Sequence, residues 1–213
     1  MSIQKKHQRG FTLVEIAIVL VIIGLLIGGV LKGQELIYNQ KVKSTYDSYR
    51  QYTAAMYGYQ DRYKALPGDD ANALTRGFIV QAGDPAIVAG NGNGLISGGG
   101  NSCNNAAAGP ATEVCQANYH LRLSGFLTGQ GTISATHPFG GVVVLNSPTV
   151  VAAFTSPSAV CWFNVTNKAA QQIDASYDDG RATTGSMRGS ANYTTGNAAN
   201  PDAITSPWIC MSN

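Results

Sequence analysis

Residues 11–31 read FTLVEIAIVLVIIGLLIGGVL, an apolar run in which only Thr12 and Glu15 are polar. A helix of this run would be about 30 Å long, which matches the hydrocarbon core of a bilayer. The ten residues before it contain three basic side chains and no acid: Lys5, Lys6 and Arg9. Because positive charges favour the cytoplasmic side, the sequence predicts one membrane-spanning helix with the C-terminus outside.

Two simpler interpretations explain this segment less well. A secretory signal peptide would end in small residues of the A-x-A type, and residues 30–34 (VLKGQ) lack them. A plain membrane anchor explains the length and the flanking charges, but a carboxylate near its start costs a few kcal/mol. Glu15 therefore needs a partner or a function.

The segment Gly10-Phe11-Thr12-Leu13-Val14-Glu15, behind its short basic leader, resembles the class III signal of type IV pilins and type II secretion pseudopilins. The resemblance implies that a prepilin peptidase cuts between Gly10 and Phe11 and methylates the new amine of Phe11. It also implies that Glu15 pairs with that amine on a neighbouring subunit during filament assembly, because opposite charges attract strongly in lipid.

The same resemblance implies three parts of the chain. Residues 1–10 are the cleaved leader, and residues 11–33 are the membrane and filament-core helix. Residues 34–213 are the periplasmic or extracellular head, which includes the amphipathic second half of the helix over residues 34–65.

One position departs from the family. Major pilins often carry a proline about eight residues after a helix glycine matching Gly24, and this chain has Lys32 there. The helix keeps several glycines, which can allow bending or close helix packing: Gly24, Gly28, Gly29 and Gly33. The departure makes an ordinary major pilin less favoured.

The composition describes a folded, polar, loop-rich protein with little net charge. Charged residues make up 12% of the chain, and the formal charge is +2. The rest of the chain is close to neutral once the basic leader is set aside. It has no general electrostatic reason to bind nucleic acid.

The four cysteines predict two disulfides and an oxidising compartment. Their spacing fits neither a zinc ribbon nor a C-x-x-C pair, and disulfides persist in the periplasm or outside the cell. Of the three possible connectivities we prefer Cys103–Cys115 with Cys161–Cys210, because the second bond would hold the C-terminus against a core strand.

The remaining pattern predicts an α+β, pilin-like fold. The helix continues to residue 64, with tyrosines every three or four residues that are expected to pack on a sheet while their hydroxyls stay in water. Residues 67–116 read as a long turn-rich surface loop. The elements expected after this loop are a helix over residues 118–128, strands of an antiparallel meander over residues 139–145, 150–155 and 159–165, and a helix over residues 167–177 capped by Asn167.

The head offers few candidate sites. Residues 90–94 (GNGNG) lack the G-K-[ST] ending of a phosphate loop, and Asp69 and Asp70 do not follow EF-hand spacing. Major pseudopilins bind calcium through acids in a C-terminal loop, so the resemblance makes Asp178 and Asp179, with Asp174, weak calcium candidates. No other cofactor is expected.

The sequence predicts an assembly protein and not an enzyme. His120 and His137 lie in neither a metal-binding motif nor a nucleophile-and-base arrangement. The favoured function is a type IV pilus subunit serving adhesion, motility or DNA uptake. A type II secretion pseudopilin is the alternative, and a membrane-tethered periplasmic enzyme is a remote one. The expected partners are the prepilin peptidase, identical or related subunits, and an inner-membrane assembly platform.

Overall fold

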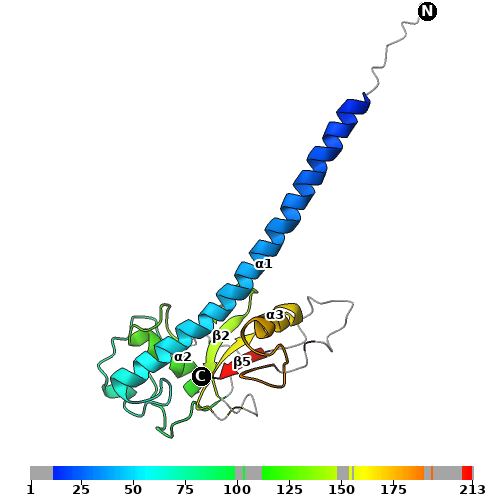
Figure 1. Cartoon of the computed structure of the whole chain (residues 1–213). Helices are drawn as coiled ribbons and strands as arrows, with labels where there is room; N and C mark the ends of the chain where they lie inside the picture. The colour runs from blue at the N-terminus through cyan, green and yellow to red at the C-terminus, as the bar shows by residue number, and fades with distance from the viewer. Residues whose placement is uncertain are drawn as a thin grey trace, which may run out of the picture. The chain divides into compact units, whose positions relative to one another are not determined.

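The chain divides into two units, Met1–Gln40 and Lys41–Asn213. This computed structural model describes residues 12–98, 103, 112–147, 154, 156–189, 193 and 208–212. The helix α1, Leu13–Tyr63, has 51 residues and contributes to both units (Figure 1). Its bounds agree within one residue with the predicted helix. It remains helical through Lys32, where the family comparison had suggested a proline.

The end of α1 follows from local backbone chemistry. The amide of Lys64 donates to the carbonyl oxygen of Gln60 at 2.8 Å, and Lys64 itself has a φ of 55°. A residue in this left-handed conformation terminates a helix. Pro67 follows soon after and cannot continue it.

The second unit contains a five-stranded sheet in which every described pair of strands is antiparallel, with the order β1-β2-β3-β5-β4. Its strands are β1 (Ala135–Thr136), β2 (Val142–Asn146), β3 (Ala159–Phe163), β4 (Met187–Gly189) and β5 (Trp208–Ser212). The predicted meander was wrong in its order, because β2 pairs directly with β3. Most of the strand predicted over residues 150–155 lies outside the described residues.

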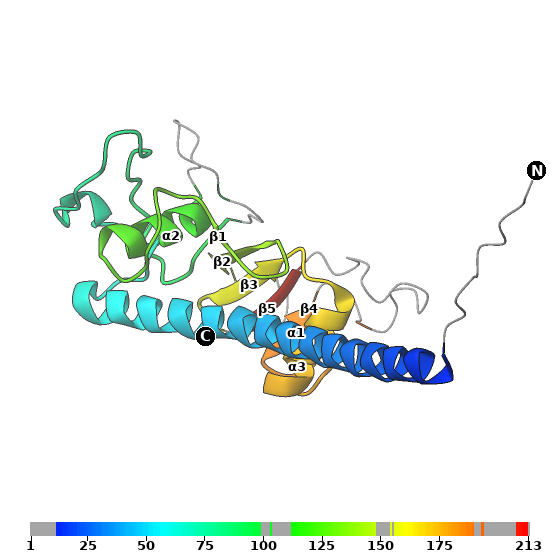
Figure 2. The same ribbon diagram turned by 90° about the horizontal axis from the view of Figure 1, so that it is seen from above.

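Strand β3 is buried along its whole length because both faces of the sheet are covered. On one face, the Trp162 indole donates to the carbonyl of Thr45 at 3.0 Å and to Ser48 Oγ at 2.8 Å. These bonds tie β3 to α1, which passes beside the sheet (Figure 2). On the other face Cys161 belongs to an apolar cluster with Val144, Ala159, Phe163 and Cys210. Side chains of a strand alternate between its faces, which explains how neighbouring residues serve both layers.

The tyrosines of α1 pack as predicted, but their hydroxyls do not all stay in water. Tyr52 and Tyr59 are buried. The hydroxyl of Tyr52 donates to the carbonyl of Val143 at 3.3 Å, and that of Tyr59 donates to Asp70 at 2.8 Å. These tyrosines therefore link α1 to the sheet and to the following loop.

The two shorter α-helices test the local predictions. Helix α3, Asn167–Tyr177, has the predicted bounds, but its cap is Thr166, whose Oγ1 accepts from the amide of Ala169 at 3.3 Å. Helix α2, Glu113–Leu123, begins five residues before the predicted helix and ends five residues earlier than predicted. Gly125 has a φ of 82° just after α2 and so ends it before Gly129, where the prediction placed the end.

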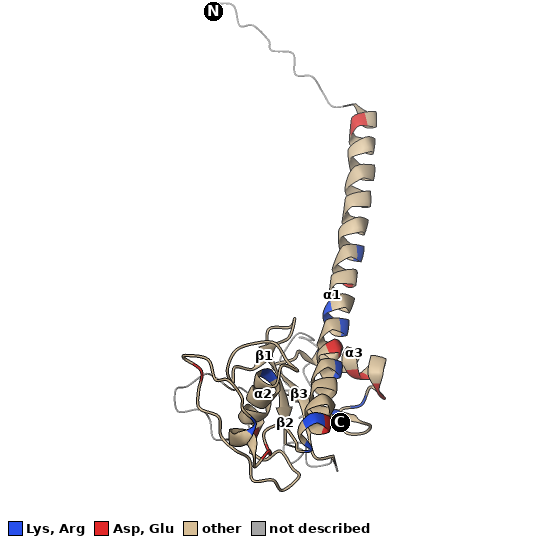
Figure 3. Cartoon of the chain, turned by 90° about the vertical axis from the view of Figure 1, so that its left-hand side faces the viewer, with Lys and Arg blue, Asp and Glu red and all other residues tan. Residues whose placement is uncertain are grey.

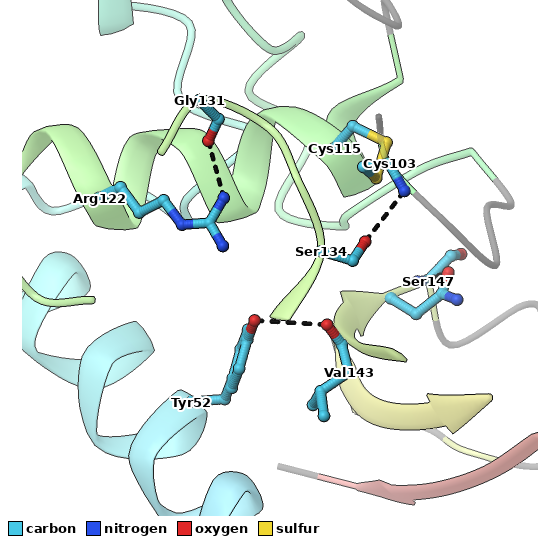
Figure 4. Close-up of a disulfide and its surroundings, with 9 residues drawn as sticks. Tyr52, Cys103, Cys115, Arg122, Gly131, Ser134, Val143 and Ser147 are labelled. Carbon is cyan, nitrogen blue, oxygen red and sulfur yellow. Dashed lines mark hydrogen bonds between the residues drawn. A yellow bond between two sulfur atoms is a disulfide. The ribbon is translucent and has the colours of Figure 1, made fainter. Parts of the chain in front are cut away.

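Both disulfides have the connectivity that the sequence analysis preferred. Cys103 pairs with Cys115 of α2, and Cys161 of β3 pairs with Cys210 of β5, its direct cross-strand neighbour. The segment at Cys103 is also tied to Ser134, through the Cys103 amide to Ser134 Oγ at 2.9 Å (Figure 4). The C-terminal strand is thus held inside the sheet, between β3 and β4.

Replacing Cys161 and Cys210 together by alanine is expected to lower the free energy of unfolding by about 4 kcal/mol, against about 3 kcal/mol for Cys103 and Cys115. The difference arises because the first bond spans 49 residues and the second spans 12. Urea unfolding of the full chain in detergent, followed by tryptophan fluorescence, measures both. A larger loss for the Cys103 and Cys115 pair would contradict this ranking.

Candidate functional site

The first turn of α1 carries a hydrogen-bonded box made by Thr12 and Glu15. Glu15 Oε2 accepts from the amide of Thr12 and from Thr12 Oγ1, both at 2.9 Å, and the Glu15 amide donates to Thr12 Oγ1 at 3.3 Å. This is the reciprocal arrangement of a capping box, in which a threonine and a glutamate satisfy amides at the helix start. Glu15 therefore has a partner within its own chain, which the sequence analysis did not anticipate.

The box leaves part of the Glu15 carboxylate available. Only Oε2 accepts bonds within the described residues, and no described residue donates to Oε1. The predicted cleavage residues Gly10 and Phe11 lie outside the described residues. Of the three predicted site residues, the structure therefore describes only Glu15, whose carboxylate lies at the start of the apolar helix.

The first unit exposes a continuous apolar helical surface. From Ile16 to Leu31 the helix has no charged residue (Figure 3). Its large apolar side chains are about half exposed or more, with Leu25 at 73%. The best 18-residue window has a mean hydropathy of 2.9, and none of it is buried in the chain. By length and composition α1 can cross a membrane, which fits membrane anchoring.

The glycines of this surface have no packing role within the described chain. A Cβ added at Gly24, Gly28, Gly29 or Gly33 would meet nothing within 4 Å. Each glycine costs the helix up to about 1 kcal/mol relative to alanine. Their spacing of four residues, Gly24 to Gly28 and Gly29 to Gly33, is the one that lets helices approach closely in membranes.

In the head, two acids organise the GNGNG loop. Asp69 accepts from the amides of Asn93 at 3.0 Å and Gly94 at 2.7 Å, and Glu113 accepts from the amides of Asn91 at 3.0 Å and Ser97 at 2.7 Å. Asp69 and Glu113 are both buried. The prediction of a surface loop was thus wrong for Pro67–Asp70, although the GNGNG residues themselves are largely exposed.

Asp70 forms a second buried contact set beside the first. It accepts hydrogen bonds from the hydroxyl of Tyr59 at 2.8 Å and from the guanidinium of Arg76 at 3.0 and 3.1 Å. Although burial opposes ionisation, the hydrogen bonds from Arg76 and Tyr59 hold the pKa of Asp70 below its usual value. Asp70 is therefore an ionised structural acid, with its oxygens already committed.

His120 is a buried neutral histidine that joins α2 to this loop. Its Nδ1 accepts from the amide of Gly68 at 3.0 Å, so Nε2 carries the proton and donates to the carbonyl of Val88 at 3.2 Å. Burial lowers the pKa of His120 to about 4. His137 is also buried, with Nε2 2.9 Å from the carbonyl of Phe163. Each ring thus contacts backbone groups.

The fold is expected to lose stability as the pH falls from about 6.5 to about 4 because of His120. Its folded pKa is depressed, so the neutral ring stabilises the fold above pH 6.5, and that contribution of about 3 kcal/mol disappears in this window. Urea unfolding at pH 7.5 and 4.5 should give a smaller pH difference for His120→Asn than for the wild type. Equal pH differences in the two proteins would refute this assignment.

The C-terminal acids form the one group of three or more potential metal ligands in the described part of the chain. One carboxylate oxygen from each of Asp174, Asp178 and Asp179 lies within 4.8 Å of the others. All three carboxylates already accept hydrogen bonds: Asp174 from Gly180 and Tyr193, Asp178 from Met187 and Ser186, and Asp179 from Arg181 and Thr184. An ion would have to share or displace these donors, and calcium binding stays a prediction.

A capped helix with an exposed apolar window, followed by a disulfide-bonded α+β head, fits a prepilin-like protein. In agreement, residues 5–31 match the prokaryotic N-terminal methylation motif. The match covers the start of the chain and leaves the head outside it. No curated protein and no solved structure matches the chain. The motif suggests a structural role rather than a catalytic one.

Proposed function

We propose that this chain is a structural subunit of a type IV pilus or pilus-like filament, processed after Gly10 and assembled through α1. The methylation motif at residues 5–31 carries this proposal. The apolar surface of α1 supports it, because the same surface can lie first in lipid and then against sister helices. The head stays outside the membrane, where its two disulfides are stable.

Glu15 has two functions in this proposal. Oε2 caps its own helix, and Oε1 pairs with the methylated amine of Phe11 on a neighbouring subunit. A buried charge is stabilised by an opposite charge and penalised when alone. The pair therefore fixes the axial position at which a new subunit docks. The glycines at Gly24 and Gly28 let the helices approach closely.

The type II secretion pseudopilus is the second candidate. Lys32 in place of a proline is compatible with it, since that proline is common in major pilins. Both filaments need the same cleavage, an inner-membrane assembly platform and the same docking pair. They differ in where the filament ends, and in whether it serves adhesion, motility or DNA uptake, or protein secretion.

Immunogold electron microscopy of sheared surface filaments, with antibodies against the head, tests the proposal and separates the candidates. Labelled long filaments, absent from a deletion strain, are the result expected for a pilus subunit. Label confined to the periplasm, with extracellular proteins retained in the deletion strain, would indicate a pseudopilin. A chain that stays in the inner membrane while filaments and secretion are unchanged in the deletion strain would overturn both.

A further inference from the structure

The head contains a polar pocket of about 430 Å³ beside α2. Cavities of this size commonly hold small ligands. Two loops and one side of α2 form its walls, and the lining residues include Ile79, Asp84, Tyr119, Arg122, Leu123 and Gly129. None of these residues belongs to α1, the helix that carries the proposed assembly function.

Two of the lining residues each carry a buried polar atom that lacks a partner within the described residues. Tyr119 is fully buried, and its hydroxyl has no hydrogen-bond partner among the described residues. Oδ1 of Asp84 is also buried without a partner in the described chain. Burial, and secondly the charge of Asp84, raise the pKa of Tyr119, so its hydroxyl keeps its proton at neutral pH. An unpaired buried polar group destabilises the chain, and a ligand that bonds to it can recover that loss.

Arg122 supplies a positioned donor in the same pocket. Its Nε donates to the carbonyl of Thr128 at 3.4 Å, and its Nη1 donates to that of Gln130 at 3.1 Å. Nη1 also donates to the carbonyl of Gly131 at 2.8 Å (Figure 4). A Cβ at Gly129 would lie 2.6 Å from Arg122 Nε, so glycine leaves room for the guanidinium. No described residue accepts from Nη2, which remains for a ligand.

The donor set selects the kind of ligand. Two of the three guanidinium nitrogens are already bound to carbonyls, so Arg122 cannot hold a carboxylate or phosphate by a two-point clamp. The negative charge of Asp84 further disfavours an anion. The acceptor of Asp84, the donor of Arg122 and the phenol of Tyr119 instead match the hydroxyl groups of a ligand, because a hydroxyl can both donate and accept. Ile79, 84% exposed, and Leu123 add apolar surface for the carbon face of a ring.

We propose that this pocket binds a neutral, hydroxyl-rich ring, such as a sugar. One hydroxyl donates to Asp84 Oδ1, another accepts from Arg122 Nη2, and the Tyr119 hydroxyl, at the buried side, bonds to the same ring. The site would give the head a carbohydrate-recognition function that is independent of filament type.

The test is an NMR titration of the ¹⁵N-labelled full chain in a detergent without a sugar headgroup. Glucose, galactose and N-acetylglucosamine are each added to about 100 mM, which detects even millimolar binding. We expect at least one to shift the amides of Asp84, Gly129 and Gly131 saturably. Asp84→Asn should weaken that binding at least about tenfold, whereas Asp61→Asn, on an exposed acid of α1, should not.

Tyr119→Phe provides a second variant, because removal of an unpaired buried hydroxyl should leave the fold intact while weakening sugar binding. Acetate and glycine serve as charged probes. The proposal is overturned if no sugar gives saturable shifts, which would leave the pocket to ordered water. It is equally overturned if Asp84→Asn binds as the wild type does, or if acetate or glycine binds more tightly than every sugar.

Discussion

Glu15→Gln is expected to exclude the chain from filaments while the head stays folded. Glutamine at this position can still cap α1, because a capping box accepts either glutamate or glutamine, so the variant removes mainly the charge. A neighbouring amine would then be buried alone, at a cost of about 3 to 5 kcal/mol, which lowers incorporation by more than about 100-fold. Quantifying the chain in purified filaments, relative to the membrane fraction, measures this.

Two matched variants separate docking from capping. Glu35→Gln changes an exposed acid of the same helix that pairs with Lys32, and it should assemble normally. Thr12→Ala breaks the box but keeps the Glu15 charge, so its effect should be far smaller than that of Glu15→Gln. Incorporation of Glu15→Gln at the wild-type level would refute the docking function, and equal defects in the two box variants would make capping the cause.

Glu113→Ala is expected to lower the free energy of unfolding of the head by about 3 kcal/mol or more. The buried carboxylate accepts from the amides of Asn91 and Ser97 and from the Ser97 hydroxyl, and its loss leaves these donors without their charged acceptor. Hydrogen bonds to charged groups each contribute about 1.5 to 3 kcal/mol. Urea unfolding of the full chain in detergent gives the value.

Asp61→Ala is the control for this prediction. The Asp61 side chain is 88% exposed and contacts Lys64 on the surface, so its removal should change stability by less than about 0.5 kcal/mol. A loss at Glu113 no larger than that at Asp61 would mean that the loop is held by other contacts.

The parts of the fold that depend on local chemistry could be predicted from the sequence. α1 is marked by its apolar run and then its amphipathic spacing, and the bounds of α3 were predicted correctly. The order of the sheet could not be predicted, since β5 pairs with β3 from 49 residues away and only the Cys161–Cys210 bond hinted at it. The early end of α2 had a local signal in Gly125, which was overlooked.

The candidate sites also divide into those that have a local signal in the sequence and those that depend on distant partners. The capping box of Thr12 and Glu15 is visible in the sequence as a threonine three residues before a glutamate, although only the intermolecular role was inferred from it. The burial of Asp69 had no local signal, because its partners Asn93 and Gly94 lie 24 and 25 residues further along the chain. Glu113 and the pocket at Tyr119 were missed for the same reason.

The intact mass of the chain purified from its own membranes tests the central claim most directly. Processing predicts that the wild type lacks residues 1–10 and carries one added methyl group on Phe11, whereas Gly10→Val keeps the whole leader and gains no methyl. A wild-type chain that retains residues 1–10 would contradict the prepilin account.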